Sequence, residues 1–250
     1  MSRMIFRCDP AFEGRVPRPL PAREALPDWL RRMPQQAFSP ARGDNVRTVK
    51  HCPPFVDAMA HGVMMPLPCD VLVQDGQFTW EWEMPPPRAS LHPRAPLSFH
   101  VPEQASGTPL FMPGQVIVKF NSVWTIELEP GWSLLATHPF NRADLPFRTL
   151  TGMVDCDRFR DVGILFPAVW TQADFHGVLP AGTPVAQLIA VPRAPAALEY
   201  ATLDPARFDS TARALLSEKG VYRRRFRSPR LREQALAEPF EIEDEHPAPG

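Results

Sequence analysis

Two short polar stretches carry the side chains of this sequence that are best suited to chemistry. The first is "VDCD", residues 154–157, which contains two acids, and the second is "HPFNRAD", residues 138–144. An ionised carboxylate accepts hydrogen bonds and can orient a water molecule, a neutral histidine can act as a base, and arginine can hold an anionic group through paired hydrogen bonds. Together the two stretches predict a site for a small anionic molecule.

If that site is enzymatic, we expect Asp155 and His138 to be its catalytic groups, because either could transfer a proton. The expected ligand-binding residues are Asn141, Arg142, Asp144 and Asp157. The residues leave open whether the site catalyses a reaction or only binds a ligand. They assign no cofactor and no metal.

Both stretches also have a structural interpretation. Short acidic side chains often accept backbone N–H bonds in a β-turn, which would explain Asp155 and Asp157 without any chemistry. Likewise, Arg142 could simply pair with Asp144 or Asp155 inside an ordinary loop. The chemical interpretation therefore requires that Arg142 or His138 faces Asp155 across a pocket.

The composition of the chain narrows the class of protein. Its 250 residues carry a formal net charge of −1, which argues against a nucleic-acid binder with a strongly basic surface. No apolar run approaches the ~18 residues of a membrane span. We therefore expect a cytoplasmic protein that has no membrane partner and no nucleic-acid partner, with a homo-oligomer left open.

Local patterns predict a mainly β fold. The chain has 32 prolines, scattered between short apolar runs, which disfavours long helices. Asp75-Gly76 is a strong hairpin signal, and Phe78, Trp80 and Trp82 alternate with polar residues, so the three aromatics should share one face of a strand. Turn signals recur between the apolar runs, which is typical of an antiparallel barrel or sandwich.

The expected organisation has four parts. In chain order they are an extended arm (1–46), a β-rich core domain (47–195), a helical extension (196–237) and a disordered acidic tail (238–250). Within the extension, Asp204 and Gly220 are the expected caps of an amphipathic helix.

Two resemblances bear on the fold. The layout "KHCPPFVDAM…GVMMPLPCDV", "WTIELEPGWSLLATHPFNR", "LTGMVDCD" and "GTPVAQLIAVPR" resembles an uncharacterised protein family found in bacteria and some of their phages. More narrowly, "LTGMVDCD" followed by "GTPVAQLIAVP" is similar to the trimeric dUTPase and dCTP deaminase group. The first resemblance implies a shared β-rich fold and the second a β-clip or related barrel. The expected fold is therefore an antiparallel barrel or sandwich, β-clip or cupin-like.

The dUTPase resemblance also implies a role for one acid. It would make Asp155 the carboxylate that orients a water for attack on a nucleotide phosphate, with Gly152 and Val154 shaping the pocket. The chain departs from that pattern at Arg158, where the group has an aromatic residue. The resemblance is therefore applied to the fold, because function does not follow from fold alone.

Two further alternatives remain open. A non-haem iron oxygenase would need two histidines and a carboxylate, and His138, Asp144 and His176 supply those residue types. A non-enzymatic interaction or assembly protein of phage-related origin would instead use Trp80, Trp82 and the proline-rich loops as contact surfaces.

Overall fold

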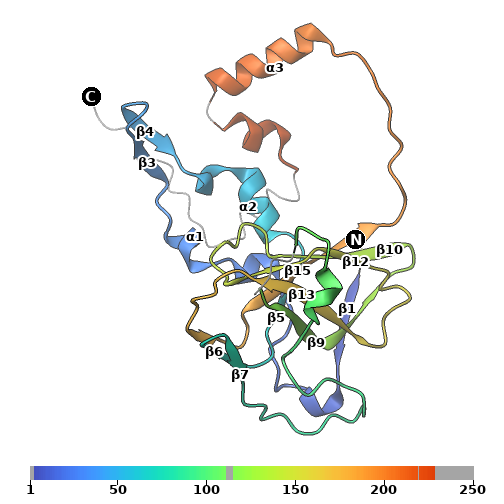
Figure 1. The fold of residues 1–250 in the computed structure, drawn as a ribbon. Helices are drawn as coiled ribbons and strands as arrows, with labels where there is room; N and C mark the ends of the chain where they lie inside the picture. The colour runs from blue at the N-terminus through green and yellow to red at the C-terminus, as the bar shows by residue number, and fades with distance from the viewer. Residues whose placement is uncertain (1–2, 111–114, 219, 229–250) are drawn as a thin grey trace. The chain divides into compact units, whose positions relative to one another are not determined.

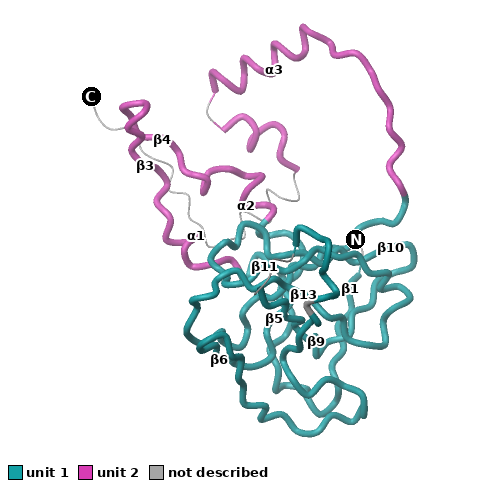
Figure 2. The backbone as a smooth tube through the Cα atoms, in the orientation of Figure 1, with its two compact units in different colours: residues 1–25, 59–194 teal, residues 26–58, 195–250 magenta. Residues whose placement is uncertain are grey.

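The computed structural model describes residues 3–110, 115–218 and 220–228. The chain divides into two compact units, one formed by residues 1–25 and 59–194 and the other by residues 26–58 and 195–250 (Figure 2). The first unit contains three antiparallel β-sheets. Among the described residues the second unit contains short helices and one β-hairpin.

The first five-stranded sheet is built around a long, largely buried strand, β9 (Figure 1). Its members are β1 (Met4–Cys8), β8 (Leu97–Phe99), β9 (Ile117–Leu128), β11 (Phe147–Thr149) and β13 (Gly163–Trp170). β9 pairs with β1, β8 and β13, and β11 continues the sheet beyond β13.

The second five-stranded sheet follows the order β12-β10-β15-β5-β2. Its members are β2 (Leu20–Pro21), β5 (Val63–Pro66), β10 (Trp132–Thr137), β12 (Gly152–Val154) and β15 (Pro184–Pro192). β10 and β15 pair over six residues, from Trp132 opposite Pro192 to Thr137 opposite Gln187.

A three-stranded sheet contains the predicted hairpin. β6 (Val71–Gln74) and β7 (Gln77–Thr79) are joined through Asp75 and Gly76, and β14 (Gly177–Leu179) pairs with the other edge of β6. Both turn residues have positive φ, 50° and 72°, as a two-residue type I′ connection requires.

One hydrophobic core joins the sheets of the first unit. Its fully buried side chains come from both five-stranded sheets and include Phe120, Phe147, Leu134 and Leu188. The rings of Phe120 and Phe147 have centroids 4.7 Å apart. The mainly β, sandwich-like fold is thereby confirmed, and none of the sheets in the described part of the chain closes into a barrel.

The three aromatics predicted after the hairpin do lie on the core side of the chain, but β7 ends at Thr79, so Trp80 and Trp82 lie beyond the strand. Phe78, Trp80 and Trp82 all pack against the core as partly buried side chains. Phe78 additionally meets the edge of Trp170, with ring centroids 4.8 Å apart. These aromatics therefore contribute to the core.

The start of the chain is part of the first unit, which corrects the expected arm of residues 1–46. Residues 4–8 form β1 and pair with β9 along their whole length, from Met4 opposite Leu128 to Cys8 opposite Trp124. Phe12, in the 3₁₀ turn Pro10–Phe12, is completely buried in the core. β9 requires a partner along its outer edge, and β1 supplies it. The first unit therefore includes residues 1–25, and the boundary expected near residue 47 is wrong.

The second unit has its own anchoring contacts. Its elements are α1 (Asp28–Arg32), β3 (Gln36–Ser39), β4 (Asp44–Arg47), the 3₁₀ turn Val49–His51, most of α2 (Pro53–Ala60), α3 (Pro205–Ser217) and a π-helical turn (Tyr222–Phe226). Lys50 Nζ donates to the carbonyls of Arg31 and Met33, at 2.9 and 3.0 Å. Arg227 makes a two-pronged ion pair with Asp57, one bond of which is 3.1 Å long.

The predicted C-terminal helix begins as expected, but it ends with Glu218 at its C-cap and not with Gly220. Asp204 caps α3 by accepting a hydrogen bond from the backbone N–H of Arg207 at 3.1 Å. α3 buries none of its residues. The expected acidic tail, residues 238–250, lies outside the described residues. No helix of the described ranges combines the length and apolar composition needed to cross a membrane.

A glycine substitution tests the close approach of the backbone at Gly62 to β15. Gly62 has φ +77°, and a Cβ built on it would overlap the carbonyl oxygen of Leu188. Gly76 has a similar φ, +72°, but open space around it. We expect Gly76→Ala to cost about 1 kcal/mol through backbone conformation alone. Gly62→Ala should cost about 1–3 kcal/mol more, since the backbone must also move.

Urea unfolding of the two variants and the native chain measures both costs. Equal free energies of unfolding for Gly62→Ala and Gly76→Ala would contradict the close approach of Gly62 to β15.

Candidate functional site

Both acids of "VDCD" form ion pairs with the same arginine, Arg193. Arg193, directly after β15, donates from Nε to Asp155 Oδ1 at 3.1 Å and from Nη2 to Asp157 Oδ1 at 2.5 Å. The Ser133 hydroxyl also donates to Asp155 Oδ1, at 2.7 Å, and the N–H of Gly131 donates to Asp157 Oδ2 at 3.2 Å. We call Ser133, Asp155, Asp157 and Arg193 the arginine clamp.

Electrostatics within the clamp favour its charged form. The guanidinium of Arg193 lowers the pKa of the Asp157 carboxyl, and Asp157 in turn raises the pKa of Arg193. Burial, together with the acids on either side, raises the pKa of the Cys156 thiol to about 11, so this cysteine stays protonated at neutral pH. A protonated, buried thiol is a poor nucleophile. The ion pairs of Arg193 with Asp155 and Asp157 join the ends of β12 and β15, and the Ser133 hydroxyl links them to β10.

The turn after β12 meets the structural interpretation for Asp157, whose side chain accepts the N–H of Gly131, and the backbone of Asp155 closes the turn. The carbonyl of Asp155 accepts hydrogen bonds from the N–H groups of Arg158 and Phe159, at 2.9 and 2.8 Å. Asp155 has the more exposed side chain, 49% against 8% for Asp157.

The "HPFNRAD" stretch forms a second cluster that is also internally bonded. His138 Nδ1 accepts from the N–H of Thr149 at 3.2 Å, which requires that Nε2 carries the proton and donates to the carbonyl of Arg142 at 2.9 Å. Burial lowers the pKa of His138, so its ring is neutral. Arg142 pairs with Asp144 through two parallel bonds, Nε to Oδ1 at 2.8 Å and Nη2 to Oδ2 at 2.9 Å.

A buried glutamine, which the sequence did not point to, fixes this loop. Gln187 in β15 is fully buried; its Oε1 accepts from the N–H of Phe140 at 2.8 Å, and its Nε2 donates to the carbonyl of His61 at 2.6 Å. Asn141 adopts φ +58°, the left-handed conformation that asparagine tolerates better than most residues. Tight anchoring of this kind indicates a structural loop.

The strand register separates the two clusters, which corrects the expectation of a single pocket. Asp155 bonds to Ser133 near the start of β10, whereas His138 directly follows its end at Thr137. At ~3.3 Å per residue, the five residue steps from Ser133 to His138 span roughly 16 Å. Arg142 and His138 therefore do not face Asp155 as opposite walls of one site.

The iron-oxygenase alternative receives no support from side-chain positions. The structure brings no three His, Cys, Asp or Glu side chains of the described residues together in a way that could hold a metal ion. Both ring nitrogens of His138 are already bonded to backbone groups. His176 lies 3.9 Å from Asp75, at the β6–β7 turn.

A surface hollow lies beside β1, in a part of the chain where the sequence predicted only an extended arm. It has a volume of about 510 Å³, and its lining is Phe6, Arg7, Cys8, Pro10, Glu13, Gly14, Arg18, Pro19 and Trp124. We call it the β1 hollow. A second hollow of about 490 Å³ shares Arg7 with it and is otherwise lined by Thr125, Glu127, Arg160 and Asp161.

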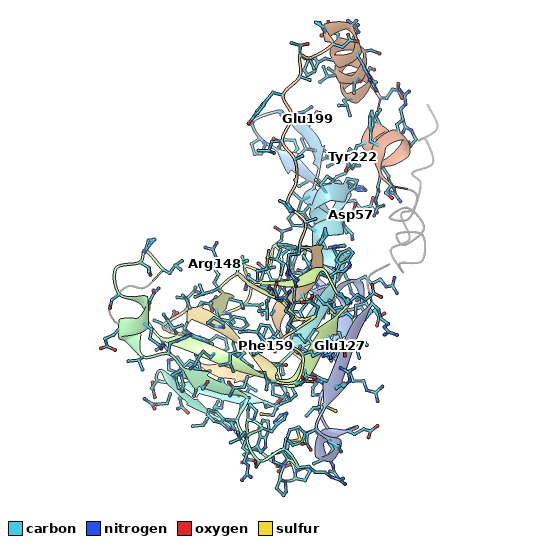
Figure 3. All side chains as sticks on the ribbon, turned by 90° about the vertical axis from the view of Figure 1, so that its right-hand side faces the viewer. Asp57, Glu127, Arg148, Phe159, Glu199 and Tyr222 are labelled. Atoms are coloured by element: carbon cyan, nitrogen blue, oxygen red, sulfur yellow. The ribbon has the colours of Figure 1, made fainter. Side chains whose placement is uncertain are left out.

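Within the described part of the chain, three of the four charged residues in the second hollow are paired, the exception being Asp161. Glu127, on β9 where that strand runs beside β1 (Figure 3), accepts from Arg7 at 2.5 Å and lies 3.3 Å from Arg160 Nη1. The hydrogen bond from Arg7 lowers the pKa of Glu127. The carboxylate of Glu127 thus balances positive charge at Arg7, which also lines the β1 hollow.

The β1 hollow contains two charges that are not matched in this way. The side chains of Glu13 and Arg18 make no ion pair or hydrogen bond with another residue in the described part of the chain. The indole N–H of Trp124 donates to the carbonyl of Pro17 at 3.0 Å and so ties the 13–19 loop to β9.

One sequence signal could have located this hollow. In "MIFRC" the side chains of Met4, Phe6 and Cys8 pack against the core while Arg7 points outward, which is the period-two pattern of a half-buried strand.

Comparison of the chain with models of protein families, curated proteins and solved structures finds no match. The shared fold with the dUTPase group stays a prediction.

The clamp predicts a pH-dependent stability difference. Asp157→Asn should lower the free energy of unfolding at pH 7, because the charge that holds Arg193 is removed. The folded pKa of Asp157 lies below its ordinary value of 3.8. Its stabilisation is therefore complete above pH ~3.8 and is lost as the pH falls through the folded value. Thermal unfolding between pH 2 and pH 7 should show the two proteins converging in acid.

Asp161→Asn is the matched control, since Asp161 is exposed and has no ion pair among the described residues. A loss for Asp157→Asn no larger than the control's, or one that does not change with pH, would count against the clamp.

The bonding of His138 predicts its titration. Nitrogen-15 NMR should find the proton on Nε2 at neutral pH, and the ring should titrate below the ordinary histidine pKa of 6.5 because it is buried. Titration at or above 6.5 would show that the ring is solvated and free to act as a base.

Proposed function

We propose that this protein binds a small molecule through an anionic group in the β1 hollow. The observation that carries the proposal is the guanidinium of Arg18, which has no protein partner among the described residues and borders a hollow with apolar walls. A volume of about 510 Å³ falls within the roughly 300–1,000 Å³ of ordinary ligand pockets.

The chemistry of the walls supports an amphipathic ligand. Phe6, Trp124 and two prolines, Pro10 and Pro19, offer apolar surface beside the charge. Arginine binds carboxylates and phosphates with two parallel bonds, and it does so more strongly where neighbouring apolar groups exclude water. A ligand with an anionic head and a short apolar body would use both features.

Binding is favoured over catalysis by the state of the expected catalytic groups. Asp155 is held by Arg193 and Ser133, and His138 bonds to backbone groups through both ring nitrogens. Neither group lines the β1 hollow. A ligand-binding role therefore needs no rearrangement of the two clusters.

The test uses 4-methylpentanoate, a carboxylate with a short apolar body. Its binding should shift the NMR signals of the Gly14 amide and the Trp124 indole N–H. Arg18→Gln should weaken this binding about tenfold or more, because a charge-assisted hydrogen-bond pair is lost. Arg94→Gln removes the same charge from an exposed site that does not line the hollow.

Equal weakening by the two substitutions would show that only net charge matters and would contradict the site. So would binding that leaves the Gly14 and Trp124 signals in place.

A further inference from the structure

The charges lining the β1 hollow can be counted after internal pairing. Arg7 shares Glu127 with Arg160, and with Asp161 beside them these four residues have no net charge. The other charges of the lining are Arg18, a cation, and Glu13, an anion. Both residues are exposed at the hollow and have no partner of opposite charge among the described residues. The remaining charge is therefore a separated pair with no net excess.

The charges of Glu13 and Arg18 both influence the thiol of Cys8. Its partly buried thiol lies in the lining of the hollow. Burial and the carboxylate of Glu13 raise the pKa of this thiol, whereas the guanidinium of Arg18 lowers it. Glu13, Arg18 and Cys8 thus line one hollow together with Phe6 and Trp124.

A purely anionic ligand fits this region poorly. Its charge would be attracted by Arg18 but repelled by Glu13, and the carboxylate of Glu13 would lose solvent without gaining a partner. A ligand that carries an ammonium group together with its carboxylate removes both costs. Charge pairs of this kind discriminate mainly through the repulsion felt by the wrong ligand.

We propose that the ligand of the β1 hollow is a zwitterionic amino acid or short peptide with an apolar side chain. Arg18 binds its carboxylate, Glu13 binds its ammonium group, and Phe6 and Trp124 contact the apolar side chain. This inference rests on the proposed function, since it names the ligand class of the same site.

The experiment compares ligands that differ by one charge. L-leucine and L-leucyl-L-leucine carry both charges, 4-methylpentanoate lacks the ammonium group of leucine, and 3-methylbutylamine lacks its carboxylate. Binding to the full chain is followed by the NMR signals of Gly14 and Trp124. At least one of the two zwitterions should bind about tenfold more tightly than both truncated analogues.

Substitutions assign each charge to its residue. Glu13→Gln should weaken binding of the preferred zwitterion about tenfold while leaving 4-methylpentanoate unchanged or tighter. Arg18→Gln should weaken both ligands. Both side chains are exposed, so the variants should fold, which their amide spectra verify.

The outcomes separate the two proposals. If 4-methylpentanoate binds as tightly as both zwitterions and depends on Arg18 alone, the zwitterion inference is wrong and the anionic site stands. If Arg18→Gln changes the binding of no ligand, the proposed function itself is wrong. If Glu13→Gln weakens the zwitterion and the carboxylate equally, Glu13 does not bind the ammonium group and the inference is overturned.

Discussion

The fold of the first unit depends on satisfying the backbone of β9. This twelve-residue strand is buried at most of its positions, so its N–H and C=O groups need partners along both edges. β13 supplies one edge, and β1 and β8 supply the rest. The pairing with β1 takes the first residues of the chain into the sheet, and the β1 hollow forms where the chain leaves β1 and returns through the 13–19 loop.

The arginine clamp plays a comparable role for the second sheet. Three strand ends meet where Arg193 bonds to Asp155 and Asp157, and Asp157 also accepts the N–H of Gly131. Removing one partner of such a group would leave the others uncompensated, which is why clustered charges of this kind are costly to break. Asp155 and Asp157, which the sequence suggested as chemically active residues, thus join the ends of neighbouring strands.

The β1 hollow differs from these clusters in how its charges are used. Around the clamp and the "HPFNRAD" loop each charged group has an opposite charge at hydrogen-bond distance. At the hollow, Glu13 and Arg18 keep their charges available to solvent beside apolar walls. Perturbed or unmatched groups next to a concavity are the usual mark of a ligand site, and paired groups in a turn are the usual mark of structure.

The local features of this protein were predictable from its sequence because they depend on neighbouring residues. The hairpin at Asp75-Gly76, the aromatic face of Phe78 and the cap at Asp204 all follow from short-range rules of turn, strand and helix geometry.

The tertiary structure alone decided the partners of the charged residues. Asp157 binds an arginine 36 positions away, and Arg142 turns to its neighbour Asp144 instead of Asp155. Residues 4–8 and Trp124 become neighbours only through strand pairing across more than a hundred residues. Which side chains stay unpaired depends on such long-range contacts, and for that reason the candidate site moved from the acids of "VDCD" to Glu13 and Arg18.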